Sequence, residues 1–374
     1  MSWSFRIGRF FGIDVFVHLT LPLVLGAFVV EAYSRKQDWG AVLEQLVFSV
    51  VLFAIIVLHE YGHALTARLF GIQTRDILLL PFGGVARLES MPRNSWQELL
   101  IAGAGPAVNF VLAGLCLVCF VVDGTFMKLV EHAQQGMPAP GAPAPAFLTE
   151  SRALYWFAVN VLLALFNLLP AFPLDGGRML RAILALPFDY VRATWIAARV
   201  GQGFAVLLGV GGLYSGNFWL VIIALFIWRA GVAEAQGVTV RASLEGVRVR
   251  QVMSAAFRTL NPFDTLDIAA QTMASTAQLE FPVLHGESFV GLITRQEIAA
   301  GLKQLGGSRY VSEVMRRDLR AVGPNDLLLD ILPQLRQRGG QSLPVIEGNQ
   351  LIGLISPSEL GTALKGPATA PSAG

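Results

Sequence analysis

Long stretches without charged residues constrain this chain more than any other feature of its sequence. A helix needs about 20 mainly apolar residues to cross the hydrocarbon core of a bilayer. Runs of that length recur up to Trp228 and do not occur after it. The composition agrees, since 54% of the 374 residues are hydrophobic and 14% are charged. The sequence therefore predicts an α-helical polytopic membrane protein whose composition changes near Gly237.

We expect four single membrane helices followed by a helical hairpin. The uncharged stretch from Val200 to Trp228 is too long for one span, and the Gly and Asn residues at its centre favour a turn between two short helices. The prediction is about six transmembrane helices, and five is the alternative. The single helices are predicted over Val15–Val30, Leu46–Leu69, Leu99–Val122 and Ala153–Leu174.

Arginine residues set the predicted orientation in the membrane. They occur before the first helix, between the second and third, and after the fourth, for example at Arg6, Arg75 and Arg192. Because basic loops stay in the cytoplasm, we predict a multi-pass protein of the cell (inner) membrane with cytoplasmic N- and C-termini and an external segment that contains Met137–Pro145. The net charge of +2 without a basic stripe argues against nucleic acid as a partner.

The last third of the chain contains an internal repeat. Phe281-Pro282-Val283-Leu284 recurs as Leu343-Pro344-Val345-Ile346, and three further segments recur with the same offset of 62 residues. Each copy is predicted to contain an extended stretch, a helix, two short strands joined by a turn, and a second helix. The predicted domains are a transmembrane domain over residues 1–240, repeats over 247–305 and 309–366, and a disordered tail over 367–374.

A candidate metal-binding motif lies in the second apolar run. In His59-Glu60-Tyr61-Gly62-His63, the two imidazoles are four residues apart on one helical face, where both can reach one metal ion. Glu60 is angularly adjacent and can act on a bound water. Imidazoles and a carboxylate at membrane depth are costly unless they pair, line water or bind a metal. The alternative is a polar helix contact or a non-catalytic cavity.

A hydrolytic zinc site needs a third protein ligand and an open position for water. Asp175 follows an uncharged run of about 22 residues and is expected at the inner end of the fourth helix, on the same side as the two histidines. Alternatively, Asp175 is a helix-terminal residue paired with Arg178 or Arg181. His18, in the predicted first helix, is the other candidate ligand.

These motifs together resemble the site-2 protease family of intramembrane metalloproteases. The matching segments are His59-Glu60-x-x-His63, Gly105-Pro106-x-x-Asn109 and Asn167-x-x-Pro170-x-x-x-x-Asp175-Gly176. The resemblance implies regulated intramembrane proteolysis, in which a membrane-spanning protein substrate is cleaved within or near the bilayer, among membrane lipid. It also implies one Zn²⁺ held by His59, His63 and Asp175, with Glu60 as the catalytic base.

Two further roles follow from the same resemblance. Asn167 is expected to orient the substrate or to stabilise the oxyanion, although a helix-packing amide is equally compatible with its position. Pro81–Ala86 is similar to the family's pattern after the second helix and is expected to offer an extended edge to which an unwound substrate adds as a strand. The alternative for this segment is an ordinary turn loop.

The two soluble repeats resemble paired cystathionine-β-synthase (CBS) domains. Nucleotide-binding pairs commonly carry a Gly-x-x-Thr/Ser-x-x-Asp segment, whose hydroxyl contacts phosphate and whose Asp contacts ribose. Thr294 and Ser356 supply the hydroxyl here, so ATP or AMP is a candidate ligand, but Glu297 and Glu359 stand at the Asp positions. The alternative is a pair that serves in homodimerisation or gating.

Two other functional classes compete with the hydrolase. An ion transporter with a nucleotide-sensing tail would also place His and Asp residues in the membrane. A catalytically silent adaptor would use the repeats to bind partners. Glu60 between the two histidines, and the lack of a clear inverted repeat of broken helices, favour the hydrolase. The sequence does not identify the substrate.

Overall fold

The computed structural model describes residues 3–36, 38–81, 83–89, 92, 94–134, 151–317, 320–337 and 341–356. The chain divides into two compact units, Met1–Gln236 and Gly237–Gly374. The predicted external segment Met137–Pro145 and the predicted tail 367–374 lie outside the described residues.

The first unit contains the predicted membrane helices. In the part of the chain that the structure describes, four helices are long and apolar enough to cross a membrane. They are α2 (Trp39–Leu69), α3 (Ser95–Val122), α8 (Tyr190–Tyr214) and α9 (Phe218–Leu244). The helices α1 (Thr20–Lys36) and α6 (Arg152–Asn167) contain shorter apolar segments, while α4 (Thr125–Gln134) and α7 (Asp175–Leu184) are short. The predicted helical membrane fold is confirmed.

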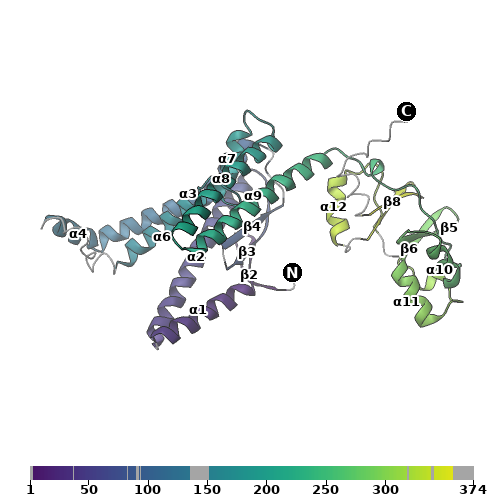
Figure 1. Ribbon diagram of the computed structural model, residues 1–374, viewed down its shortest axis with the longest axis horizontal. Coiled ribbons are helices and arrows are strands. Elements are labelled where there is room, and N and C mark those ends of the chain that lie inside the picture. Colours follow the sequence, from purple (N-terminus) through teal and green to yellow (C-terminus); the bar gives the residue numbers. More distant parts are fainter. Residues whose placement is uncertain are drawn as a thin grey trace. The chain divides into compact units, whose positions relative to one another are not determined.

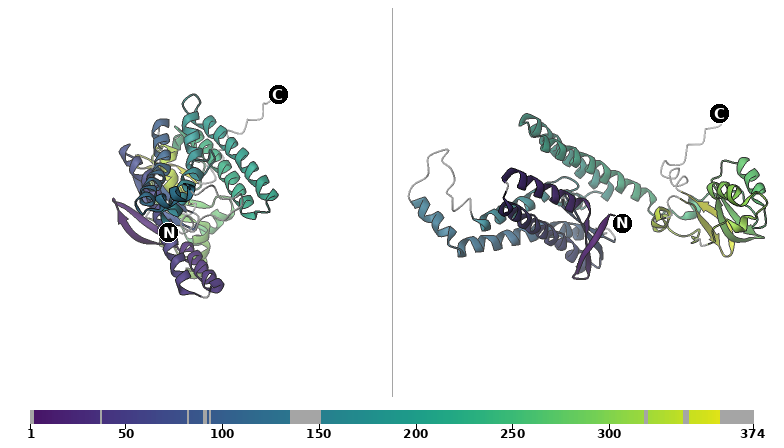
Figure 2. Two further views of the ribbon diagram at one scale, coloured as in Figure 1. Left: turned by 90° about the vertical axis from the view of Figure 1, so that its left-hand side faces the viewer. Right: turned by 90° about the horizontal axis from the view of Figure 1, so that it is seen from below.

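The stretch from Val200 to Trp228 forms a helical hairpin as predicted, but both helices are long. The helix α8 begins earlier, because Asp189 caps it by accepting a hydrogen bond from the backbone N–H of Arg192. Residues 215–217 form the turn, and α8 and α9 run side by side (Figure 2). Arg192 and Arg199, which follow the predicted fourth helix in the sequence, therefore lie within α8.

The prediction of one helix over Val15–Val30 was wrong at its start. The strands β1 (Ser4–Phe10) and β2 (Ile13–His18) form an antiparallel hairpin, and α1 begins only at Thr20. In β2 the buried side chains of Ile13, Val15 and Val17 alternate with half-buried ones. This period of two belongs to a strand with one buried face, and it was hidden by the high overall hydrophobicity.

The prediction of a helix over Ala153–Leu174 was wrong at its end. The helix α6 stops at Asn167, and residues 168–174 are irregular before α7 starts at Asp175. Pro170 and Pro173 explain the break, since proline lacks the N–H that a helix interior uses and its ring clashes with the preceding turn. Asp175 therefore lies in the first turn of a helix and not at the end of one.

A four-stranded sheet packs against the helix that carries the histidine motif (Figure 1). Its strand order is β1, β2, β3 (Thr74–Leu80) and β4 (Gly83–Leu88), so β4 is an end strand. The pairing of β2 with β3 is parallel, and the other two pairings are antiparallel. Buried residues of β2 and β3, such as Val15 and Ile77, pack with Tyr61 and Ala64 of α2.

The second unit contains the predicted repeat. Its sheet has the order β5 (Glu280–His285), β6 (Ser288–Thr294), β8 (Gln350–Ile355) and β7 (Leu343–Glu347). A helix precedes each hairpin, namely α10 (Leu266–Ala274) and α12 (Leu328–Gln337), and α11 (Arg295–Leu305) follows the first. Short 3₁₀ turns, η1 (Val249–Gln251) and η2 (Val311–Glu313), begin the two copies. The final helix predicted for the second copy lies outside the described residues.

The first part of each copy's N-terminal extended stretch pairs with the hairpin of the other copy. Ser254 of the first copy forms a β-bridge with Leu354 in β8, and Arg316 of the second copy forms one with Leu292 in β6. Each copy therefore contributes backbone pairing to the hairpin of the other, and the two repeats form one folded unit.

Candidate active site

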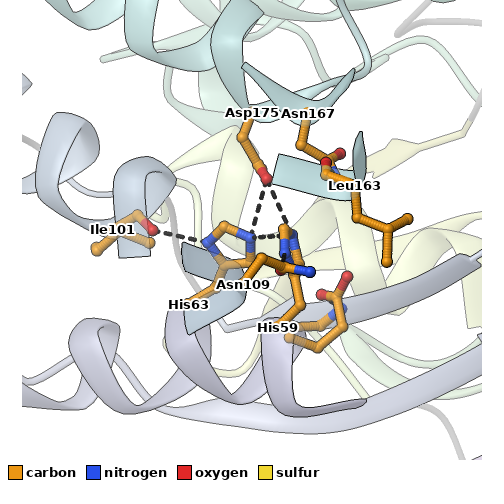
Figure 3. Close-up of polar contacts among 9 residues, drawn as sticks. His59, His63, Ile101, Asn109, Leu163, Asn167 and Asp175 are labelled. Atoms are coloured by element: carbon orange, nitrogen blue, oxygen red, sulfur yellow. Dashed lines mark hydrogen bonds and ion pairs between the residues drawn. The ribbon is translucent and has the colours of Figure 1, made fainter. Parts of the chain in front are cut away.

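His59 and His63 project from α2 toward the first residue of α7 (Figure 3). Four residues make slightly more than one helical turn, so both imidazoles lie on the same face. His59 Nε2 and His63 Nε2 are each 3.1 Å from Asp175 Oδ2, and the two Nε2 atoms are 3.2 Å apart. Among the described residues, these three form the group that could hold a metal ion.

The spacing of these three atoms fits a zinc ion. Ligands about 2.0–2.1 Å from one metal at tetrahedral angles lie roughly 3.3 Å from each other, close to the observed 3.1 and 3.2 Å. The three residues are only 6–7% exposed, and a buried carboxylate beside two imidazoles needs a metal or a proton between them. Two nitrogens and one carboxylate oxygen also leave a fourth position for water.

The second nitrogen of each imidazole has its own partner. His59 Nδ1 lies 2.6 Å from Asn109 Oδ1, and His63 Nδ1 lies 2.7 Å from the Ile101 carbonyl oxygen. Because both partners accept, Nδ1 carries the proton and the Nε2 lone pair faces Asp175, which is the tautomer that binds metal. Asn109 is fully buried and donates in turn to Asn160 at 3.4 Å. The sequence motif contained Asn109 but indicated no role for it.

Gly105 of α3 leaves the space into which both imidazoles point. A Cβ atom at this position would lie 2.2 Å from His63 Nε2 and 2.6 Å from His59 Nε2. Any side chain here would therefore collide with both nitrogens that face Asp175. A glycine inside a long apolar helix is the sequence signal for such a close approach.

Glu60 is half-buried and contacts the sheet. Its Oε2 accepts a hydrogen bond of 2.9 Å from the backbone N–H of Ala86 in β4. The strand that overlaps the predicted edge Pro81–Ala86 therefore lies beside the predicted catalytic base.

The comparisons with known proteins give the family. The sequence profile of peptidase family M50 matches residues 47–208, and the CBS domain profile matches residues 249–303 and 311–366. The solved structure of a site-2 protease from Methanocaldococcus jannaschii is 30% identical, with a TM-score of 0.43, and the match covers 62% of this chain and 95% of that one. The chain belongs to the site-2 protease family.

Full-length relatives share both parts of this protease. The zinc metalloprotease MJ0392 of Methanocaldococcus jannaschii is 29% identical over 361 residues, which cover 96% of each chain. Rip3 of Mycobacterium tuberculosis is 28% identical over 381 residues, which cover 96% of this chain and 92% of Rip3. The protein is therefore a site-2-type metalloprotease with Zn²⁺ as its metal and a C-terminal pair of CBS domains. This result excludes the two competing hypotheses, an ion transporter and a catalytically silent adaptor.

Asn167 of the protease lies beside Asp175 but is turned into its own helix (Figure 3). Its Nδ2 donates to the carbonyl oxygen of Leu163, one turn earlier in α6, at 3.0 Å. In this conformation one of the two amide N–H groups is used within the helix, and an oxyanion role would use the other.

The structure places His18 apart from the three candidate ligands and pairs Arg181 with carboxylates other than Asp175. His18 ends β2, and its Nδ1 is 2.8 Å from Thr20 Oγ1, so it lies outside the metal-ligating group. Arg181 does not pair with Asp175, because its guanidinium donates to Glu98 at 2.8 Å and also contacts Glu234.

This Arg181 cluster was not predicted from the sequence. Arg181 is 1% exposed, and its Cζ lies 5.1 Å from the Phe172 ring and 5.0 Å from the Tyr190 ring. The ion pairs connect α7 to α3 through Glu98 and to α9 through Glu234. Because α7 starts with Asp175, the cluster fixes the helix that presents this carboxylate. Charged residues inside otherwise apolar helices were the available signal.

Thr294 and Glu297 of the first CBS repeat bond to each other. Thr294 caps α11 by accepting from the Glu297 N–H at 3.2 Å, and Glu297 Oε2 accepts from the Thr294 N–H at 2.9 Å. Burial raises the pKa of the Glu297 carboxyl, but hydrogen bonds from Arg316 and Thr294 outweigh burial and lower it. Glu297 is thus charged and engaged internally. Ser356 follows β8, and Glu359 lies outside the described residues.

Proposed function

We propose that this protease hydrolyses peptide bonds of membrane-spanning protein substrates, with His59, His63 and Asp175 as zinc ligands and Glu60 as general base. One observation carries the proposal, namely the convergence of three potential ligand atoms within 4.8 Å. These atoms come from α2 and α7, and His59 and Asp175 are 116 positions apart in the sequence.

Zn²⁺ at such a site supplies Lewis acidity, which lowers the pKa of water and polarises a carbonyl. Glu60 takes a proton from the attacking water and returns it to the leaving amine. The hydrogen bonds of Nδ1 to Asn109 and Ile101 keep both imidazoles aligned during these steps. We assign Asn167 to substrate orientation or oxyanion stabilisation, through the amide N–H that does not donate to the Leu163 carbonyl.

The substrate is proposed to pair with β4 as an added strand. The end position of β4 in the sheet and its contact with Glu60 support this proposal. A helical substrate has to break local backbone hydrogen bonds before its carbonyl is accessible. We therefore expect cleavage sites near helix-weakening residues.

Two substitutions test the catalytic assignment. Glu60→Gln should abolish cleavage and leave the zinc content of the purified protein unchanged, because the three ligands remain. His59→Ala should lose zinc as well as activity. Wild-type turnover by a zinc-loaded Glu60→Gln protein would exclude Glu60 as the base. The same inactive variant can trap substrates for identification by mass spectrometry.

We place the protease in the cell (inner) membrane as a multi-pass protein with cytoplasmic termini. The apolar helices and the predicted cytoplasmic arginines support this topology. We propose a transmembrane domain over 1–240 and CBS repeats over 247–305 and 309–366. Reporter fusions after Arg241 and within Met137–Pro145 should report opposite compartments, and the same compartment for both would contradict the topology.

We also propose that ATP or AMP binds the CBS pair at Thr294 and Ser356 and alters cleavage. A ligand at Thr294 has to compete with the internal bonds from Thr294 and Arg316 to Glu297. Calorimetry on the full-length protein should show binding that Thr294→Ala or Ser356→Ala weakens. If millimolar nucleotide does not bind, homodimerisation or gating becomes the role of the pair.

A further inference from the structure

One carboxylate oxygen of Glu60 is already occupied by the backbone of the protein itself. The Ala86 N–H donates to Glu60 Oε2 at 2.9 Å. A hydrogen bond to an ionised carboxylate is stronger than one between neutral groups. The carboxylate proposed to act on water is therefore held, in this structure, by a strand of the sheet.

The Ala86 N–H lies on the free edge of β4. Ala86 pairs with Ile77 of β3 in an antiparallel register, and Gly84 pairs with Leu79. Backbone polar groups of a strand alternate between its two edges. Because the Ala86 N–H points to Glu60 and not to β3, the polar backbone groups of Ala86 and Gly84 face the outer edge. This is the edge at which an added strand would form its hydrogen bonds.

The Glu60 side chain also packs against the face of β4 that is turned toward α2. A Cβ atom at Gly84 would lie 2.6 Å from Glu60 Cγ and 3.2 Å from Glu60 Cδ. The side chain thus lies against the β4 backbone itself, and only glycine permits this approach. An added strand and Glu60 in its present position would compete for the Ala86 N–H.

We infer that Ala86 holds Glu60 in a resting position and that a substrate strand pairing with β4 releases it, an inference that rests on the proposed role of Glu60 as base. The carbonyl oxygen of the substrate replaces the carboxylate as acceptor for the Ala86 N–H. No backbone donor loses its partner in this exchange, and the freed carboxylate can take a proton from water. Both carboxylate oxygens are then free of the sheet only where an extended substrate segment lies in place.

Amide hydrogen exchange at Ala86 tests this contact directly. The measurement uses the full-length, zinc-loaded protein in nanodiscs, followed by NMR with ¹⁵N-labelled alanine. Glu60→Ala removes the acceptor, so the Ala86 amide should exchange about tenfold faster or more. Glu60→Gln keeps a side-chain carbonyl oxygen and should retain most of the protection. Glu89→Ala, which removes an exposed carboxylate next to β4, should change nothing.

Adding a membrane-spanning substrate to the inactive Glu60→Ala protein tests the exchange of acceptors. Protection of the Ala86 amide should return, because the substrate carbonyl now accepts from it. If the Ala86 amide exchanges as slowly in Glu60→Ala as in the wild type, the contact between Glu60 and Ala86 is overturned. If its exchange is fast in Glu60→Ala and substrate does not slow it, the replacement of Glu60 by the substrate carbonyl is overturned. Cleavage of the same substrate by the wild-type protein is measured separately, and its failure would count against the proposed function and not against the contact.

Discussion

Replacement of Asn109 by leucine should show how far the zinc site depends on the partner of His59. Leucine has the same number and branching of side-chain heavy atoms as asparagine but no polar atoms. The variant therefore removes the acceptor that lies 2.6 Å from His59 Nδ1, at a position that is 0% exposed. Water cannot easily replace that acceptor, so the Nδ1–H of His59 is left unpaired in the interior.

The expected loss is about 10–100-fold in zinc affinity, the usual effect of removing the outer partner of a metal-bound histidine. This ratio corresponds to about 1.4–2.7 kcal/mol. It agrees with the range of about 1–3 kcal/mol for leaving one buried donor without an acceptor. The two estimates have the same physical origin. The imidazole without an acceptor either tilts away from the metal position or stays in place with a buried, unpaired N–H.

Competition for zinc with a chromophoric chelator measures this affinity on the purified protein. Asn109→Asp keeps the accepting oxygen and should bind zinc at least as tightly as the wild type. Asn160→Ala should have a smaller effect than Asn109→Leu, because the bond between the two asparagines is long at 3.4 Å. A folded Asn109→Leu protein with wild-type zinc affinity would refute the role of this hydrogen bond.

Three further substitutions test the packing around the site. Gly105→Ala should abolish zinc binding, because its Cβ would lie 2.2 Å from His63 Nε2, whereas Gly114→Ala in the same helix meets no atom within 4 Å and should bind zinc normally. Arg181→Met should lower the free energy of unfolding by about 3–5 kcal/mol, because it leaves the buried Glu98 carboxylate without its ion-pair partner. A thermal-shift measurement should show this as a lower melting temperature, and adding Glu98→Gln to the same protein should recover part of the loss. Asp175→Asn keeps the shape but removes the anionic oxygen, so metal analysis should find less zinc at limiting concentration, and full occupancy with full activity would exclude Asp175 as a ligand.

Local periodicity explains what could be predicted well. The helical repeat alone places His59 and His63 on one face of α2, whatever the rest of the chain does. Run length alone predicts the membrane helices, and the 62-residue offset predicts the paired hairpins of the second unit. The same reasoning failed at residues 13–18, where a strand was predicted as part of a helix. A strand with one buried face, such as β2, is as apolar as the start of a membrane helix.

The sequence by itself determined the class of protein and the local half of the metal site, because both depend on residues within one helix. Tertiary structure decided the rest. Asp175 reaches His59 across 116 positions only because α6 breaks after Asn167 and Gly105 lets the imidazoles approach α3. The contact of Glu60 with β4 likewise depends on sheet order and register, which are long-range pairings that no local spacing encodes.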